Sequence, residues 1–178
     1  MIKQTIVNVV ATASLNQDID IEKLCQFKEI LYDSNSYGGR VAYFKTNQMQ
    51  GKVSIFLSGK LISIGTKSPS QAIKELFLTK QTLIEKGIIK EVEIQPKIQN
   101  MVITVDFGKQ LDLEEFSEKT RAIYEPEQFP GAILRLEEPF KTSILLFASG
   151  KAVITALKNQ DEIEPTIQAL KNLIDSNQ

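Results

Sequence analysis

The sequence predicts an α+β fold in which one module is used twice in tandem. In each copy, helices cover one side of a largely antiparallel sheet and leave the other side open. Three observations predict this fold. A strand-like segment near the N-terminus returns half a chain later, short apolar segments then alternate with turn residues, and each copy closes with an amphipathic helix. Because two copies are too few for a solenoid, we expect one pseudo-twofold unit with repeats over residues 1–91 and 92–178.

The repeat is visible in residues 6–12 (IVNVVAT) and 98–104 (IQNMVIT), which match at an offset of 92 residues. Further on, residues 56–60 (FLSGK) match residues 147–151 (FASGK) at an offset of 91. The change of offset predicts one extra residue in the first copy, which we expect in the polar stretch 45–52.

Only one face of these two repeated strands is the same in both copies. Side chains of a strand alternate between its faces. The matching face carries Ile6, Asn8, Val10 and Thr12 in the first copy and Ile98, Asn100, Val102 and Thr104 in the second. The opposite face differs at every position, as a core face can if it stays mostly apolar. A face kept identical in two packing environments indicates two chemically similar targets.

The other elements follow from turn and capping signals. Short helices are expected near Asp20 and Asp112, the second with a capping box of Asp112 and Glu115. Strands are expected near 30–36, 40–46, 52–58 and 60–66, with counterparts near 122–128, 132–137, 142–148 and 151–157.

A long helix is expected to close each copy. Ser68 and Pro69 suit the N-cap and first position of the earlier helix, and Gly87 ends it. Its apolar stripe consists of Ile73, Leu76, Phe77, Leu83 and Ile84. The later helix is expected to start at Asp161, with Glu164 as its capping-box partner. That start places Pro165 in the first turn, where proline costs little.

Composition narrows the function classes. The chain has no histidine and a single cysteine, Cys25, which removes the usual general base, the common nucleophile pairs and any internal disulfide. We therefore expect neither an enzyme nor a metal or cofactor site, although a hydrolase with paired carboxylates stays open. The apolar runs are shorter than the ~18 residues of a membrane span and the N-terminus lacks a signal profile, which predicts a soluble, intracellular protein without membrane association.

Charge is divided unevenly along a chain whose net charge is −1. Residues 1–91 carry a net charge of +4 and residues 92–178 a net charge of −5. A nearly neutral total can therefore conceal one basic and one acidic surface. The acidic half is expected to meet a basic partner.

The open sheet face is expected to bind a ligand. Strand alternation puts Phe56 with Ser54, and Phe147 with Leu145, opposite the inward-facing Ile55 and Leu146. Cationic side chains would rim this face at Lys60, Lys67, Arg135, Lys151 and Lys158. An apolar face with amide donors and cationic edges fits the minor groove of double-stranded DNA. There A·T pairs present only acceptors, apolar side chains enter base steps, and cations meet phosphates.

Over its whole length the chain resembles the saddle domain of the TATA-box-binding protein family, in its archaeal form. The resemblance is carried by residues 6–12 and 98–102, the two Phe-x-Ser-Gly-Lys turns and, most specifically, residues 124–131 (YEPEQFPG). The family is itself a known example of minor-groove wedging and kinking. The resemblance implies a tandem-duplicated saddle, in which a curved antiparallel sheet has a concave DNA face and helices on its convex side. It also implies a general initiation factor that binds A/T-rich promoter DNA as a monomeric pseudo-dimer. Its implied location is the cytoplasm, on the nucleoid, in an archaeon, or the nucleus in a eukaryote.

The resemblance also implies residue roles. Asn8 and Asn100 would donate to central bases, and Thr155 would contact bases. Groove-floor contacts would come from Val10, Ile62, Val102 and Val153, wedges from Phe56, Phe129 and Phe147, and phosphate contacts from Lys60, Lys67, Arg135, Lys151 and Lys158. Glu125, Glu127 and Gln128 match the stirrup that receives transcription factor B, through which RNA polymerase is recruited indirectly.

The first copy departs from the family pattern. Tyr37 stands at the position of a wedge phenylalanine, Gly38 replaces proline and Tyr43 replaces arginine; Ser54 and Ile64 replace leucine and threonine. Two interpretations follow: a divergent initiation factor, or a paralogue that acts as a regulatory protein-interaction module with weak DNA binding. A small-ligand or hydrolytic domain is a third class, against which the missing histidine and the doubled surface speak.

Overall fold

The computed structural model describes residues 2–177, which form two compact units. The N-terminal unit consists of residues 8–99, and the C-terminal unit of residues 2–7 together with residues 100–177. Strands β1 (Lys3–Ser14) and β6 (Lys97–Asp106) each contribute residues to both units. The boundaries at residues 1–91 and 92–178 stay a prediction about the duplication itself.

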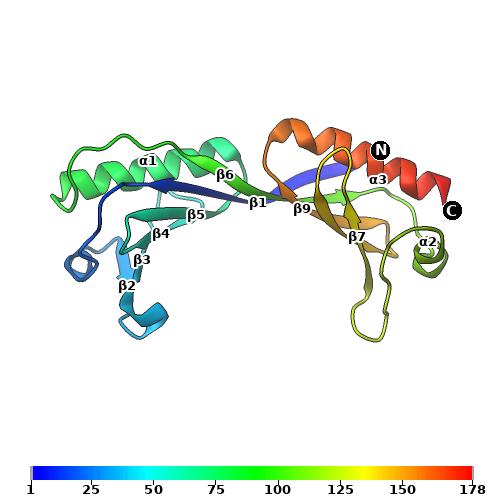
Figure 1. The fold of residues 1–178 in the computed structure, drawn as a ribbon, viewed down its shortest axis with the longest axis horizontal. Helices are drawn as coiled ribbons and strands as arrows, with labels where there is room; N and C mark the ends of the chain where they lie inside the picture. Colours follow the sequence, from blue (N-terminus) through cyan, green and yellow to red (C-terminus); the bar gives the residue numbers. More distant parts are fainter. Residues whose placement is uncertain (1, 178) are drawn as a thin grey trace. The chain divides into compact units, whose positions relative to one another are not determined.

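The N-terminal unit is an antiparallel sheet in the order β2-β3-β4-β5-β1 with a helix along one face. Its further elements are η1 (Glu22–Gln26), β2 (Ile30–Tyr32), η2 (Ser36–Gly39), β3 (Val41–Phe44), β4 (Lys52–Phe56), β5 (Lys60–Thr66) and α1 (Pro69–Glu85). In Figure 1, η2 projects beyond the end of β2, away from α1.

The C-terminal unit repeats this plan with the order β6-β9-β8-β7. Its elements are α2 (Leu113–Lys119), β7 (Gly131–Leu136), β8 (Thr142–Phe147), β9 (Lys151–Leu157), η3 (Gln160–Glu162) and α3 (Ile163–Ser176). Helix α3 covers one face of the sheet, and the loop that leads into β7 projects beyond the other (Figure 1).

Each core lies between a sheet and its helix. Ile55 and Leu146 are completely buried, which confirms that they point toward the helices. Ile167, Leu170 and Ile174 of α3 are buried, as expected for the core-facing side of an amphipathic helix. Burying such side chains contributes about 1.5–3 kcal/mol each to folding.

Several predicted elements are confirmed closely. Strands β5 and β9 span the predicted residues 60–66 and 151–157. Helix α1 begins at Pro69, and the Ser68 hydroxyl accepts a hydrogen bond from the Gln71 N–H at 3.2 Å. Asp112 caps α2 by accepting from the Glu115 N–H at 3.0 Å. Pro165 lies in the first turn of α3.

Other predictions were wrong, for identifiable reasons. Residues 122–128 do not form a strand: Ile123 makes a single bridge to Ile133 of β7, and residues 126–128 form a turn. In the predicted stripe of α1, Leu76 and Leu83 are buried, but Phe77 is 43% exposed, because Ala72, Glu75 and Thr79 complete the buried face instead. Helix α3 begins at Ile163 rather than Asp161, because residues 160–162 form the 3-10 turn η3 that leads into it. The Glu162 carboxylate accepts a hydrogen bond from the Lys158 N–H at 2.7 Å.

The extra residue of the first copy is not where the sequence placed it. Val41 pairs with Phe56, as Gly131 pairs with Phe147, yet Val41 lies nine residues after Tyr32 and Gly131 only seven after Tyr124. The loop into β3 is therefore two residues longer than the loop into β7. The β3–β4 hairpin is in turn one residue shorter than the β7–β8 hairpin.

Candidate nucleic-acid interface

The sheet face turned away from the helices is half-exposed in both units. Along β1, Val9 and Ala11 are buried completely, whereas Asn8, Val10 and Thr12 are partly exposed. Along β6, Met101 and Ile103 are buried, whereas Asn100 and Val102 are partly exposed. The strand alternation predicted from the sequence is therefore present in each unit.

Asn8 and Asn100 are each anchored by one oxygen. Oδ1 of Asn8 accepts a 2.9 Å hydrogen bond from the Gly65 N–H, and Oδ1 of Asn100 accepts a 2.8 Å bond from the Ala156 N–H. Gly65 and Ala156 have φ of 96° and 72°, in β-bulges where the strand pairing shifts register. Within residues 2–177 neither Nδ2 group donates a hydrogen bond, so both amides present N–H donors on the open face.

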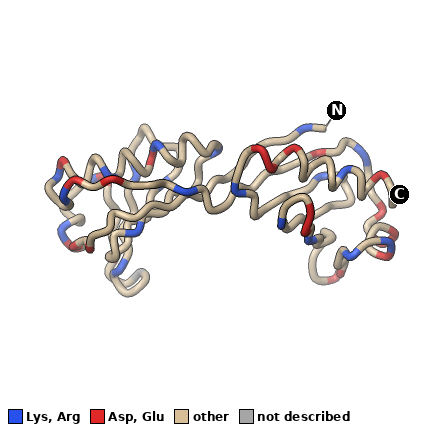
Figure 2. Tube along the Cα trace, turned by 45° about the horizontal axis from the view of Figure 1, so that its top comes forward, with Lys and Arg blue, Asp and Glu red and all other residues tan. Residues whose placement is uncertain are grey.

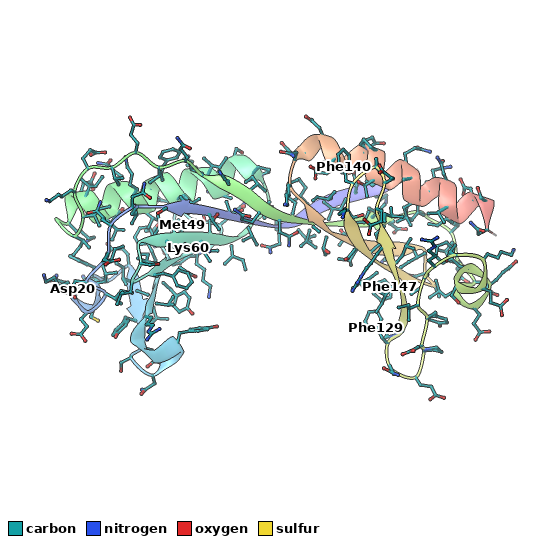
Figure 3. All side chains as sticks on the ribbon, viewed as in Figure 1. Asp20, Met49, Lys60, Phe129, Phe140 and Phe147 are labelled. Carbon is teal, nitrogen blue, oxygen red and sulfur yellow. The ribbon has the colours of Figure 1, made fainter. Side chains whose placement is uncertain are left out.

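Phe129 and Phe147 form a ring pair in the C-terminal unit. Their centroids are 5.9 Å apart at an interplanar angle of 59°, and both side chains are half-buried (Figure 3). A Cβ on Gly131 would lie 2.9 Å from one ring and 3.1 Å from the other. Gly131 therefore permits the two rings to meet over the start of β7.

Tyr37 and Phe56 are not paired in this way. Phe56 is half-buried on β4, but the Tyr37 side chain is 75% exposed on a backbone with φ of 51°. Among the described residues, Phe129 and Phe147 form the only ring pair. The longer loop of residues 33–40 carries Tyr37 as an isolated ring.

The predicted floor residues lie on the same faces, and the predicted rim cations are exposed. The apolar and hydroxyl side chains are half-exposed at Val10, Ile62, Val102, Leu145, Val153 and Thr155. The cations are exposed at Lys60, Lys67, Arg135, Lys151 and Lys158. In the part of the chain that is described, none of these five forms an ion pair.

Lys158 lies in a structured turn. Burial raises the pKa of Glu162, but hydrogen bonds from the Lys158 N–H and from Asn159 outweigh it and hold that pKa below its ordinary value. The Lys158 ammonium takes no part in these bonds.

The loop before β7 carries the predicted acidic residues. Glu125, Glu127 and Gln128 are exposed, and the Glu125 carbonyl accepts hydrogen bonds of 2.9 Å from the N–H groups of Gln128 and Phe129. The same turn thus displays two carboxylates and sets the approach of Phe129. Figure 2 marks acidic residues on this loop.

Residues 2–177 contain neither a candidate metal cluster nor a membrane-spanning helix. No group of three or more His, Cys, Asp or Glu side chains there could hold a metal ion. No helix in that range is long and apolar enough to cross a membrane.

An exposed β-sheet face of this kind is typical of proteins that bind nucleic acid through a sheet. Comparison with known proteins places the chain in that class. Residues 3–82 and 95–176 match the family described as transcription factor TFIID (or TATA-binding protein, TBP). The chain therefore belongs to the TATA-box-binding protein family, whose members are DNA-binding factors of transcription.

Individual relatives agree with this assignment. The TATA-box-binding protein of Cenarchaeum symbiosum is 38% identical over 159 residues, covering 89% of this chain and 86% of the relative. That of Methanococcus aeolicus is 35% identical over 170 residues, covering 95% and 92%. The solved structure of Methanococcus jannaschii TBP matches with a TM-score of 0.85 and 31% identity, covering 98% of this chain and 99% of that one. The predicted fold class and family resemblance are confirmed.

Proposed function

We propose that the chain is a transcription initiation factor that binds A/T-rich promoter DNA in the minor groove and bends it. The observation that carries the proposal is the pair of asparagines, each held by a bulge N–H so that its amide donors face outward. The minor-groove edges of A·T and T·A pairs present acceptors, which such donors satisfy. The cations along the face would bind phosphates, and Phe56, Phe129 and Phe147 would enter base steps.

Base-pair replacement tests this readout. Exchanging A·T for I·C pairs keeps the minor-groove pattern and changes the major groove, so we expect binding to survive. Exchanging A·T for G·C adds an amino group to the groove floor and should weaken binding. If I·C weakens binding as much as G·C does, the protein does not read the minor groove.

The acidic loop gives the proposal its protein partner. We infer that Glu125, Glu127 and Gln128 receive transcription factor B, which brings RNA polymerase to the promoter. The carboxylates are exposed on a turn that two backbone hydrogen bonds hold in place. Such a turn can serve as a preformed site for a basic partner. One molecule would act on each promoter, at the nucleoid if the host, like the relatives named above, is an archaeon.

A second candidate function rests on the exposed, unpaired Tyr37. A paralogue with a weakened N-terminal wedge would bind DNA poorly and act mainly through protein contacts. Measured affinity for one A/T-rich duplex at fixed salt separates the two, because the initiation factor needs an affinity well above non-specific binding.

A further inference from the structure

One phosphate-binding position differs between the two units. In the C-terminal unit Arg135 on β7 pairs with Ser143 on β8. Sequence alignment makes Tyr43 the counterpart of Arg135, but Tyr43 pairs with Ser54 just as Ile133 pairs with Leu145. The strand register therefore puts Lys45 and Lys52, and not Tyr43, at the places of Arg135 and Ser143.

Lys45 is not available to a ligand. Its Nζ donates hydrogen bonds to the carbonyls of Met49 at 2.8 Å, Gln50 at 2.7 Å and Gly51 at 2.5 Å. An ammonium has three N–H donors, so these bonds use all of them. Lys45 closes the β3–β4 hairpin instead of reaching out from it.

Lys52 is exposed on the open face of β4. Its Nζ lies 4.4 Å from the centroid of the Tyr43 ring, and its register neighbour on β5 is Ile64. Within the described chain it forms no ion pair. Attraction between an ammonium and a ring face orients the lysine while leaving its N–H donors to a further partner.

A hollow surrounds this lysine. It has a volume of about 780 Å³ and is lined by Lys28 and Leu31 in addition to Tyr43, Lys52 and Ile64. The carboxylate in its lining, Glu29, already lies 3.6 Å from the Lys86 ammonium. The hollow therefore combines an apolar floor with three lysines. Lys45 is bound to backbone carbonyls, whereas Lys28 and Lys52 form no ion pair in the described chain.

We infer that Lys52, seated on Tyr43, is a further phosphodiester-binding residue of the N-terminal unit, in addition to Lys60 and Lys67. In the C-terminal unit the cation is Arg135 on β7, whereas in the N-terminal unit it is Lys52 on β4. Tyr43 is the positioning residue of Lys52. Nucleic acid is favoured over an acidic protein because Lys52 shares its sheet face with the Asn8 amide, which matches base edges. The inference rests on the proposed function and adds a residue to it.

Salt dependence of binding tests the inference. Each phosphate contact contributes about 0.9 to the slope of log affinity against log salt. Lys52→Met should lower the slope by about 0.9 and the affinity at 0.1 M salt by about eightfold. Lys74→Met, an exposed lysine on α1, should leave both unchanged. A wild type that fails to bind A/T-rich DNA overturns the proposed function and this inference with it. A wild type that binds, with the same slope for Lys52→Met, overturns the inference alone.

Neutralised phosphates locate the contact. A methylphosphonate removes the charge of a single phosphate, and one is placed in turn at each position along the duplex. At one position it should weaken DNA binding by the wild type but cause no additional loss of binding in Lys52→Met. Tyr43→Phe should bind DNA as the wild type does. Tyr43→Leu should lower the affinity about two- to fivefold without changing the salt slope, because the Lys52 charge stays but the ring that orients it is gone. If no phosphate position is masked by Lys52→Met, or if an acidic peptide binds Lys52 in place of DNA, the inference is wrong.

Discussion

The backbone N–H of Ala156 donates a 2.8 Å hydrogen bond to Oδ1 of Asn100 from a left-handed conformation that interrupts the pairing of β9 with β6. Gly65 and Asn8 repeat this arrangement at 2.9 Å. A bulge leaves one N–H outside the strand ladder, and the asparagine oxygen satisfies it. Each asparagine thus supports the sheet with its oxygen and presents its nitrogen outward.

These two roles can be separated by substitution. In Asn100→Asp the carboxylate still accepts from the Ala156 N–H but has no donor for a base. We expect a melting temperature close to that of the wild type and an affinity for A/T-rich DNA lower by about 1–3 kcal/mol or more. Asn100→Ala should lose both stability and affinity. Wild-type binding by Asn100→Asp would show that the amide does not donate to DNA.

The sequence predicted the open face because alternation of side chains is a local property of strands. It did not predict the bulge at Ala156, since alanine rarely adopts a φ of 72° and only the partner strand shows the register shift. The longer loop of residues 33–40 was missed for a related reason. The sequence repeat shows only the net difference of one residue between the copies. The strand partners of Val41 and Gly131 show that the loop into β3 is two residues longer and the β3–β4 hairpin one residue shorter.

The wedge residues should contribute unequally. Phe129 and Phe147 form a supported ring pair, whereas Tyr37 is 75% exposed and carries a hydroxyl. Losing water from an unpaired hydroxyl costs about 1–3 kcal/mol, comparable to unstacking a base step. We expect Phe129→Ala and Phe147→Ala to reduce bending, measured by fluorescence at fixed salt, more than Tyr37→Ala does. Tyr37→Phe should hold or improve affinity. Equal damage from Tyr37→Ala would make the tyrosine a full wedge.

Lys45 should matter for stability rather than for phosphate binding. Lys45→Met removes three hydrogen bonds from an ammonium to the carbonyls of residues 49–51. Because the site is partly exposed and water can replace some of them, we expect a loss of about 1–2 kcal/mol in the free energy of unfolding. Urea titration measures it, with Lys52→Met as the matched control that should unfold as the wild type does. A stable Lys45→Met variant would contradict the structural role.

Asp175 predicts a pH dependence of stability. Hydrogen bonds from Lys109, at 2.8 Å, and from Lys171 lower the pKa of Asp175 from 3.8 to about 2. A lowered carboxyl pKa stabilises the fold above the unfolded value and loses that contribution as pH falls through the folded value. The melting temperature of Asp175→Asn should lie below that of the wild type at neutral pH. The gap should narrow between about pH 4 and pH 2, and a constant gap would mean that the ionised carboxylate is not its cause.

The acidic loop predicts separable protein and DNA binding. Glu125 and Glu127 are exposed and take part in no ion pair within residues 2–177, so reversing both to lysine should leave the melting temperature nearly unchanged. Binding of DNA alone should stay constant or improve, because added positive charge attracts phosphates. Recruitment of transcription factor B to the DNA complex should weaken, since its basic surface then meets like charge. A gel-shift titration of the factor onto preformed complexes measures this step, with Glu114→Lys and Glu118→Lys on α2 as an equally charged control pair. If the control pair weakens recruitment as much as the loop pair does, net charge and not the loop governs the contact.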